Sequence, residues 1–95
     1  MSDTPSAGAP APRRASQVVL FHGQGCSLCD RARAQLERLR AELDFAYEEV
    51  DITGVDALEQ AYREWLPVIE IDGQRAFVYY LNEPAFRRKL AGTGR

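Results

Sequence analysis

The chain has 95 residues, 45% of them hydrophobic and 27% charged, with a formal net charge of −2 at pH 7. This length and composition are those of one globular domain with a single core, and the charge balance gives no reason to expect a nucleic-acid partner. The longest apolar runs, VVLF and AFVYYL, fall far short of the roughly 18 residues that a membrane span requires, so we expect no membrane partner.

Residues 1–16 have the composition of a disordered tail, and the folded domain is expected at residues 17–92. The tail contains three of the five prolines and no large aliphatic residue after Met1, so it cannot bury enough apolar surface to fold. A secretory signal would place a charge before an apolar stretch, whereas Arg13 and Arg14 follow small and polar residues. We therefore expect a cytoplasmic protein.

The first half of the domain has the pattern of a strand, a helix and a second strand. Residues 17–21 (QVVLF) form a short apolar run before a glycine-containing turn, which is typical of a buried strand. Apolar residues recur at spacings of four, three and four from 30 to 43, as on an amphipathic helix. Residues 45–52 (FAYEEVDI) favour a strand that returns beside the first through a right-handed crossover.

The second half predicts a short helix and a hairpin. The helix is indicated by apolar residues at helical spacing: Val55, Leu58, Tyr62 and Trp65. It must stop before Pro67, because a residue that precedes proline avoids the helical region. The same spacing favours a core or core-rim position for Trp65. The runs VIEI and QRAFVYY flank Asp72-Gly73, a strong signal for a tight hairpin turn.

The last helix has a recognisable start and end. Asn82 can cap it, Glu83 lies in its first turn, and Leu81 can pack on Phe86 across the cap. The helix is expected to end near Gly92. The complete order of elements predicts a four-stranded mixed sheet covered by helices.

Both cysteines, Cys26 and Cys29, lie in the segment GCSLCD between the first strand and the first helix. A helix that begins at or just after them places Cys26 where unpaired N–H groups and peptide dipoles favour an anion. The thiolate is the nucleophile, and helix N-termini lower a cysteine pKa from about 8.5 to between about 3.5 and 7.5. Cys29 lies one turn further on and can resolve a mixed disulfide formed on Cys26. The pair predicts a thiol–disulfide oxidoreductase that acts on protein or low-molecular-weight disulfides.

The segments GCSLCD and LPVIEIDG resemble those of glutaredoxin-like proteins of the thioredoxin-fold superfamily, most closely a small uncharacterised subgroup that reads Cys-x-Leu-Cys. The resemblance covers residues 17–90. It implies an α/β, thioredoxin-like four-stranded mixed sheet flanked by helices in the order βαβ-α-ββα. It also implies that Pro67 is cis and faces the cysteines, and that Leu66 offers its backbone to an extended substrate. Ser27 and Leu28 complete the expected substrate-binding residues.

The chain departs from typical glutaredoxins where glutathione is gripped. It has Ser27-Leu28 instead of a proline and an aromatic residue, Gly23 instead of a basic residue, and Tyr79-Tyr80 instead of two glycines. Strand alternation predicts that one tyrosine faces the core and that the other closes the pocket over the active site. Glutathione is a candidate reductant, and no metal or organic cofactor is required.

Several further residues are candidates for a role at the site, and two other functions are compatible with the sequence. His22, Gln24 and Tyr80 are candidate modulators; His22 could exchange protons with the thiol, although a half-exposed histidine without a catalytic role is favoured. The arginines of the first helix are interpreted as a solvated face. One alternative is a non-catalytic module that binds a peptide between Pro67 and the cysteines. The other is a dimer with a shared iron–sulfur or metal site, because a closed zinc site needs four ligands and His22 is the only histidine. We otherwise expect a monomer whose partners are disulfide substrates, including glutathione mixed disulfides.

Overall fold

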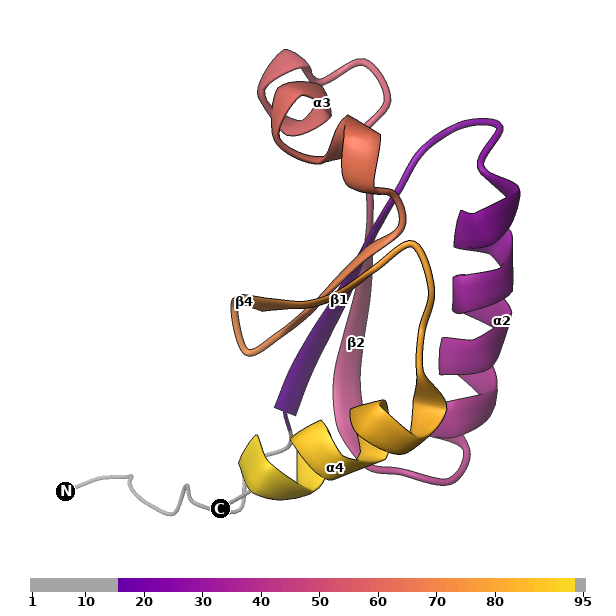
Figure 1. Ribbon diagram of the computed structural model, residues 1–95, viewed down its shortest axis with the longest axis vertical. Coiled ribbons are helices and arrows are strands. Elements are labelled where there is room, and N and C mark those ends of the chain that lie inside the picture. Colours follow the sequence, from indigo (N-terminus) through magenta and orange to yellow (C-terminus); the bar gives the residue numbers. More distant parts are fainter. Residues whose placement is uncertain (1–15, 94–95) are drawn as a thin grey trace, which may run out of the picture.

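The computed structural model describes residues 16–93, and at its centre is a mixed sheet with the strand order β2-β1-β3-β4. β1 pairs with β2 in parallel and with β3 in antiparallel orientation, and β3 pairs with β4 in antiparallel orientation (Figure 1). The strands are β1 (Ser16–His22), β2 (Phe45–Asp51), β3 (Val68–Ile71) and β4 (Gln74–Val78). This arrangement confirms the predicted α/β fold with a parallel βαβ unit followed by a hairpin.

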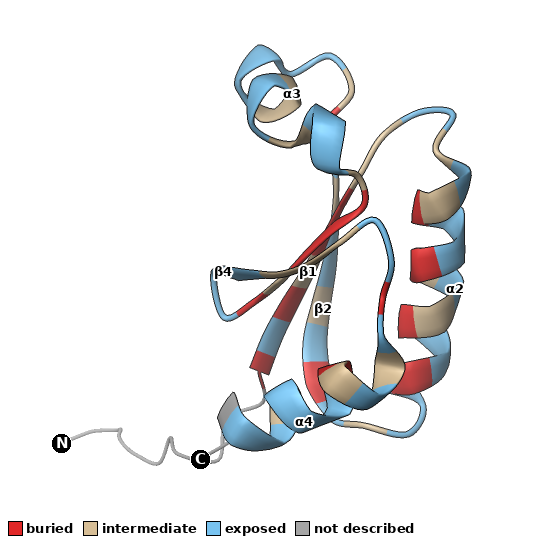
Figure 2. Ribbon diagram, viewed as in Figure 1, coloured by how far each residue is buried: buried red, intermediate tan, exposed pale blue. Residues whose placement is uncertain are grey.

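Helices cover both faces of the sheet, and alternation along β1 decides which residue meets which helix. Val18 and Leu20 belong to one apolar cluster, which includes residues of α2 (Ser27–Arg40) and α4 (Glu83–Thr93). Val19 and Phe21 belong to a second cluster, on the opposite face, with residues of α3 (Asp56–Tyr62). Buried positions accordingly alternate along β1 and line the inner side of α2 (Figure 2). Among residues 16–93, no helix combines the length and apolar character needed to cross a membrane.

The boundaries of α2 and β4 differ from the predicted ones. α2 begins and ends three residues earlier than expected. Leu43 packs against the core although it lies beyond the end of α2. Its apolar side chain therefore continues the helical spacing of apolar residues in the sequence past the end of the helix. β4 ends at Val78, because Tyr79 has a φ of 68° and its N–H donates to the Pro67 carbonyl.

The hairpin and the start of α4 agree with their sequence signals. Asp72 and Gly73 both have positive φ values, 52° and 84°, as a two-residue hairpin turn of the predicted kind requires. Asn82 Oδ1 accepts a hydrogen bond from the N–H of Ala85 at 3.0 Å, so Asn82 caps α4. Ser16, which the sequence analysis placed at the end of the tail, is the first residue of β1; residues 1–15 lie outside the described part.

Three aromatic residues do not lie where the sequence predicted. Trp65 is 42% exposed, because α3 ends at Tyr62 and the following 3-10 helix, η2 (Arg63–Trp65), changes the rotation per residue. Neither Tyr79 nor Tyr80 faces the core: they are 39% and 64% exposed, because the chain has already left β4 and strand alternation no longer applies. The favoured core or core-rim position of Trp65 and the core position of one tyrosine are therefore wrong.

Candidate active site

Cys26 is the N-cap residue of α2. Its backbone is extended (φ −103°, ψ 99°), and its Sγ accepts a hydrogen bond from the N–H of Cys29 at 3.1 Å. The sulfur thus takes the place that a serine or aspartate oxygen occupies in an ordinary N-cap. A thiolate at this position would face unpaired N–H groups and the positive end of the helix dipole.

Cys26 and Cys29 form a disulfide whose Cα atoms are 5.2 Å apart. The two residues differ in exposure: Cys26 is half-buried, whereas Cys29 is only 1% exposed. An incoming molecule can therefore reach Cys26 more readily than Cys29. The separate roles expected for the two sulfurs stay a prediction.

The loop before Cys26 packs against Leu66, the residue that precedes Pro67. A Cβ placed on Gly23 would lie 3.0 Å from Leu66 Cδ1, and 3.7 Å from side-chain atoms of Ile52 and Thr53. The Leu66–Pro67 peptide bond is cis, and Pro67 is buried. The structure therefore brings Leu66, the expected substrate-binding residue, beside the loop that leads to Cys26.

The other candidate residues near the cysteines differ in their contacts and in their exposure. The N–H of Gln24 donates to Thr53 Oγ1 at 3.1 Å, which ties the loop to the segment after β2. Leu28 is half-buried and Ser27 is exposed at the start of α2. Tyr80 is exposed beyond β4.

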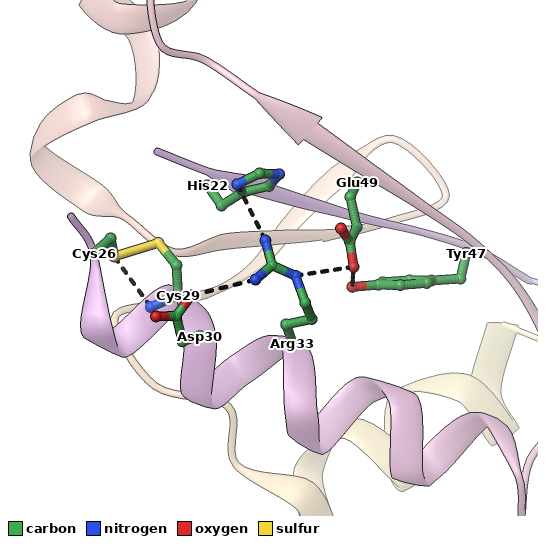
Figure 3. A network of polar contacts seen from close by, with 7 residues as sticks. All are labelled: His22, Cys26, Cys29, Asp30, Arg33, Tyr47 and Glu49. Carbon is green, nitrogen blue, oxygen red and sulfur yellow. Dashed lines mark hydrogen bonds and ion pairs between the residues drawn. A yellow bond between two sulfur atoms is a disulfide. The ribbon is translucent and has the colours of Figure 1, made fainter. Parts of the chain in front are cut away.

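His22, at the end of β1, contacts Arg33. Arg33 Nη2 lies 3.3 Å from His22 Nδ1 (Figure 3). Because a guanidinium can only donate, Nδ1 must be the unprotonated ring nitrogen in this contact. The structure thus pairs His22 with an arginine and gives no hydrogen bond between His22 and Cys26 within residues 16–93.

Arg33 is the main residue that sequence reasoning missed. It was assigned to a solvated helix face, but its side chain is only 31% exposed and also contacts Asp30 and Glu49, each at 3.2 Å. Its spacing held a signal, because Arg33 lies four residues after Cys29 and therefore on the same face of α2.

The polar groups on β2 extend this cluster. The hydroxyl of Tyr47 donates to Glu49 Oε2 at 2.8 Å. Burial, together with this hydrogen bond, raises the pKa of Tyr47, so the phenol stays protonated at neutral pH. Asp51, the neighbour of His22 in the β1–β2 register, accepts a hydrogen bond from the N–H of Thr53, and this bond lowers the pKa of Asp51.

A small pocket of about 150 Å³ lies beside the cysteine motif. Leu28 and Arg31 line it from α2, and Tyr79 and Tyr80 line it from the segment after β4. In the described part of the chain, Arg31 has no ion-pair partner. Tyr79 is held by its hydroxyl, which donates to the carbonyl of Glu64 at 2.9 Å.

Trp65 lies against Tyr79, with ring centroids 6.2 Å apart. Trp65, Tyr79 and Tyr80 are all exposed, and we refer to them as the aromatic rim. Within residues 16–93, no group of three or more histidine, cysteine and carboxylate side chains is placed to hold a metal ion.

Comparisons with known proteins agree with this geometry. Residues 17–91 match the model of the glutaredoxin-like domain family (DUF836). The uncharacterized proteins Rv0508 of Mycobacterium tuberculosis and Mb0520 of Mycobacterium bovis are each 31% identical over 80 residues, which cover 79% of this chain and 82% of theirs.

Solved structures share the fold at lower identity. The solution structure of Ne2328 from Nitrosomonas europaea has a TM-score of 0.70 at 24% identity and covers 81% of this chain and 93% of that protein. The Schistosoma mansoni thioredoxin pre-protein has a TM-score of 0.64 at 14% identity, with 85% and 81% covered. The chain therefore belongs to the glutaredoxin-like domain family (DUF836), and it has a thioredoxin-like fold.

Proposed function

We propose that this protein is a thiol–disulfide oxidoreductase that reduces protein or low-molecular-weight disulfides, with Cys26 as the nucleophile and Cys29 as the resolving thiol. The observation that carries the proposal is the position of the Cys26 sulfur as N-cap of α2, bonded to the N–H of Cys29. This position favours the thiolate, which is the reactive form of cysteine.

The reaction proceeds through two exchanges. The Cys26 thiolate attacks one sulfur of the substrate disulfide, so that a mixed disulfide forms on Cys26 and the first substrate thiolate leaves and takes a proton from solvent. Cys29 then loses its proton and attacks the Cys26 sulfur, which releases the second substrate thiol and closes the Cys26–Cys29 disulfide. Two electrons pass from the protein to the substrate.

Substrate approach is assigned to Leu66 and Pro67, with Ser27 and Leu28 between the cysteines. Leu66 has an extended backbone (φ −62°, ψ 143°) and packs against the loop before Cys26. An extended substrate segment could pair with the Leu66 backbone as a short added strand. This arrangement would present the substrate disulfide to the half-buried Cys26.

The protein-bound disulfide must be reduced again by an external thiol, and glutathione is the candidate reductant. The exchange itself needs no metal or organic cofactor. We place the reaction in the cytoplasm, where dithiols are kept reduced and a disulfide is usually transient and catalytic. The proposed form is a monomer.

Serine variants of the two cysteines test the assignment. Cys26→Ser should abolish reduction of a disulfide substrate such as insulin, because no nucleophile remains. Cys29→Ser should accumulate the mixed disulfide on Cys26, detectable by intact-mass spectrometry. Oxidised protein offered in parallel to the glutathione and thioredoxin reducing systems will identify its electron donor. A fully active Cys26→Ser protein would refute the proposal.

The exposed aromatic rim favours a second candidate, a non-catalytic module that binds a peptide beside Pro67. Titration of the Cys26 thiol separates the two functions. A pKa well below about 8.5 supports the oxidoreductase, whereas an ordinary value and no oxidation by glutathione disulfide support the binding module.

A further inference from the structure

Arg33 occupies the centre of a polar cluster between α2 and the sheet (Figure 3). Its three guanidinium nitrogens have three different partners, at 3.2 to 3.3 Å. The partners are Glu49 on β2, Asp30 on α2 and His22 on β1. Arg33 therefore links the first two turns of α2 to the two parallel strands.

The guanidinium is directed toward the end of α2 that carries the cysteines. Arg33 follows Cys29 by four residues and Cys26 by seven, so all three residues share one face of the helix. Long side chains on a helix point back toward its N-terminus. The contact with Asp30, which directly follows Cys29, shows this direction.

Arg33 carries the only positive charge in this cluster, whose carboxylates Asp30, Glu49 and Asp51 give it a net charge of −2 with Arg33 and −3 without it. Asp30 and Glu49 each contribute −1 and Arg33 contributes +1, while His22 accepts at Nδ1 as a neutral ring. Tyr47 adds a neutral hydroxyl from β2, and Asp51 is a further carboxylate on that strand. Without Arg33, Asp30 and Glu49 would be left uncompensated beside the helix end that must hold an anionic sulfur.

We propose that Arg33 is a positioning residue for the cysteine pair: it compensates the charges of Asp30 and Glu49 and fixes the start of α2 on the sheet, and thereby favours the thiolate form of Cys26. The inference rests on the proposed oxidoreductase function and extends it. Arg33 itself takes no part in the exchange of sulfur bonds.

This role has a redox consequence. When the Cys26 thiolate and the Cys29 thiol become a disulfide, one proton and two electrons leave the protein. The substrate disulfide accepts the two electrons, that proton and a second proton from solvent, and becomes two thiols. Stabilising the thiolate stabilises the reduced form, which makes the pair more oxidising. Loss of Arg33 should therefore shift the pair toward its disulfide.

The test compares four variants. Arg33→Met removes the charge and keeps most of the aliphatic stem, and Arg33→Lys keeps the charge. Arg33→Met combined with Glu49→Gln restores the wild-type charge of the cluster. Arg88→Met removes one charge from an exposed position on α4 and is the matched control.

Two readouts do not depend on turnover of any substrate. The pKa of Cys26 is measured from thiolate absorbance in a Cys29→Ser background. The redox equilibrium of the intact pair is measured against mixtures of reduced glutathione and glutathione disulfide. Circular dichroism and thermal melting establish that each variant is folded.

We expect Arg33→Met to raise the pKa of Cys26 by roughly 0.5, the size of effect expected when one nearby but partly screened positive charge is lost. The glutathione equilibrium should move about threefold toward the disulfide, which corresponds to about 15 mV. In Arg33→Lys, in the double variant and in Arg88→Met, the pKa of Cys26 and the glutathione equilibrium should both be close to the wild-type values.

The inference would be overturned if Arg33→Met and Arg88→Met had the same pKa of Cys26 and the same redox equilibrium with glutathione. So would a double variant that stays at the Arg33→Met values, because the effect would then come from lost packing and not from charge. If Arg33→Met fails to fold, Arg33→Gln takes its place, because it also removes the charge and keeps a polar side chain. The pKa of Cys26 must then be higher in Arg33→Gln than in Arg88→Met, and equal values would overturn the inference. Wild-type protein without disulfide reductase activity would refute the proposed function but would leave these two readouts intact.

Discussion

Gly23 and Leu66 are in direct contact, since a Cβ on Gly23 would lie only 3.0 Å from Leu66 Cδ1. The two residues are 43 positions apart in the chain, yet this contact sets the distance between the loop that carries Cys26 and the segment that leads into Pro67. Gly23 also stands where typical glutaredoxins have a basic side chain. Leu66 leaves no room for such a side chain unless it moves.

Gly23→Ala should impair substrate approach more than stability. The new methyl group must displace the Leu66 side chain, while the lower entropy of the unfolded chain offsets part of the cost, so the free energy of unfolding should change by less than about 1 kcal/mol. Reduction of a protein disulfide should fall severalfold, with the pKa of Cys26 unchanged. Urea denaturation and an insulin reduction assay measure the two effects. Full activity of Gly23→Ala would show that the position of Leu66 does not matter for substrates.

Gly25→Ala, in contrast, should impair stability more than substrate approach. Gly25 has a φ of 69°, and no atom lies within 4 Å of a Cβ placed there, so backbone strain is the only expected cost. A side chain in the left-handed region costs about 1 to 2 kcal/mol. The midpoint of urea denaturation should fall accordingly, and Gly25→Asn should recover part of the loss because asparagine tolerates this region. Equal stability of wild type and Gly25→Ala would contradict the positive φ.

Trp65→Ala should separate large substrates from small ones. Trp65 is 42% exposed and lies against Tyr79, so the substitution should change the free energy of unfolding by less than about 1 kcal/mol. If the aromatic rim contacts protein substrates, kcat/KM for a protein disulfide should fall roughly tenfold. The rate with bis(2-hydroxyethyl) disulfide should stay the same. A parallel loss with both substrates would assign the effect to the cysteines and not to the rim.

Glu83→Gln should change the pH dependence of stability. The hydrogen bond from Arg38, and a second one from Gln35, lower the pKa of Glu83 below its ordinary value of 4.5. A carboxyl group with a lowered pKa in the folded state stabilises the fold fully above the unfolded value, and the contribution is lost as the pH falls through the lowered pKa.

Wild type should therefore be more stable than Glu83→Gln at pH 7, and the difference should shrink as the pH falls below 4.5. Thermal melting at pH 7, 5, 4 and 3 measures the difference. Glu48→Gln, at an exposed position of β2, is the control and should show no such trend. A difference between wild type and Glu83→Gln that is independent of pH would contradict the assigned ion pair with Arg38.

Local sequence patterns were enough to predict the order of the secondary-structure elements and the place of the cysteine motif in that order. The Asp72-Gly73 turn, the Asn82 cap and the position of Cys26 at the start of α2 each depend on residues that lie within one turn of one another. Such interactions join residues that are close in the chain and do not depend on the tertiary structure. They can therefore be predicted from the sequence. Errors arose where a periodic pattern was carried past the end of its element, as at Trp65.

The amino-acid sequence by itself determined the order of elements and the pair of sulfurs at a helix N-terminus. Only the tertiary structure decided that Arg33 contacts Glu49, 16 residues away, while Arg31 has no ion-pair partner in the described part of the chain. It also decided that Gly23 meets Leu66. The physical reason is that charged residues along one helix look alike in sequence, and which of them reaches a partner depends on how the helix is rotated against strands that are distant in the chain.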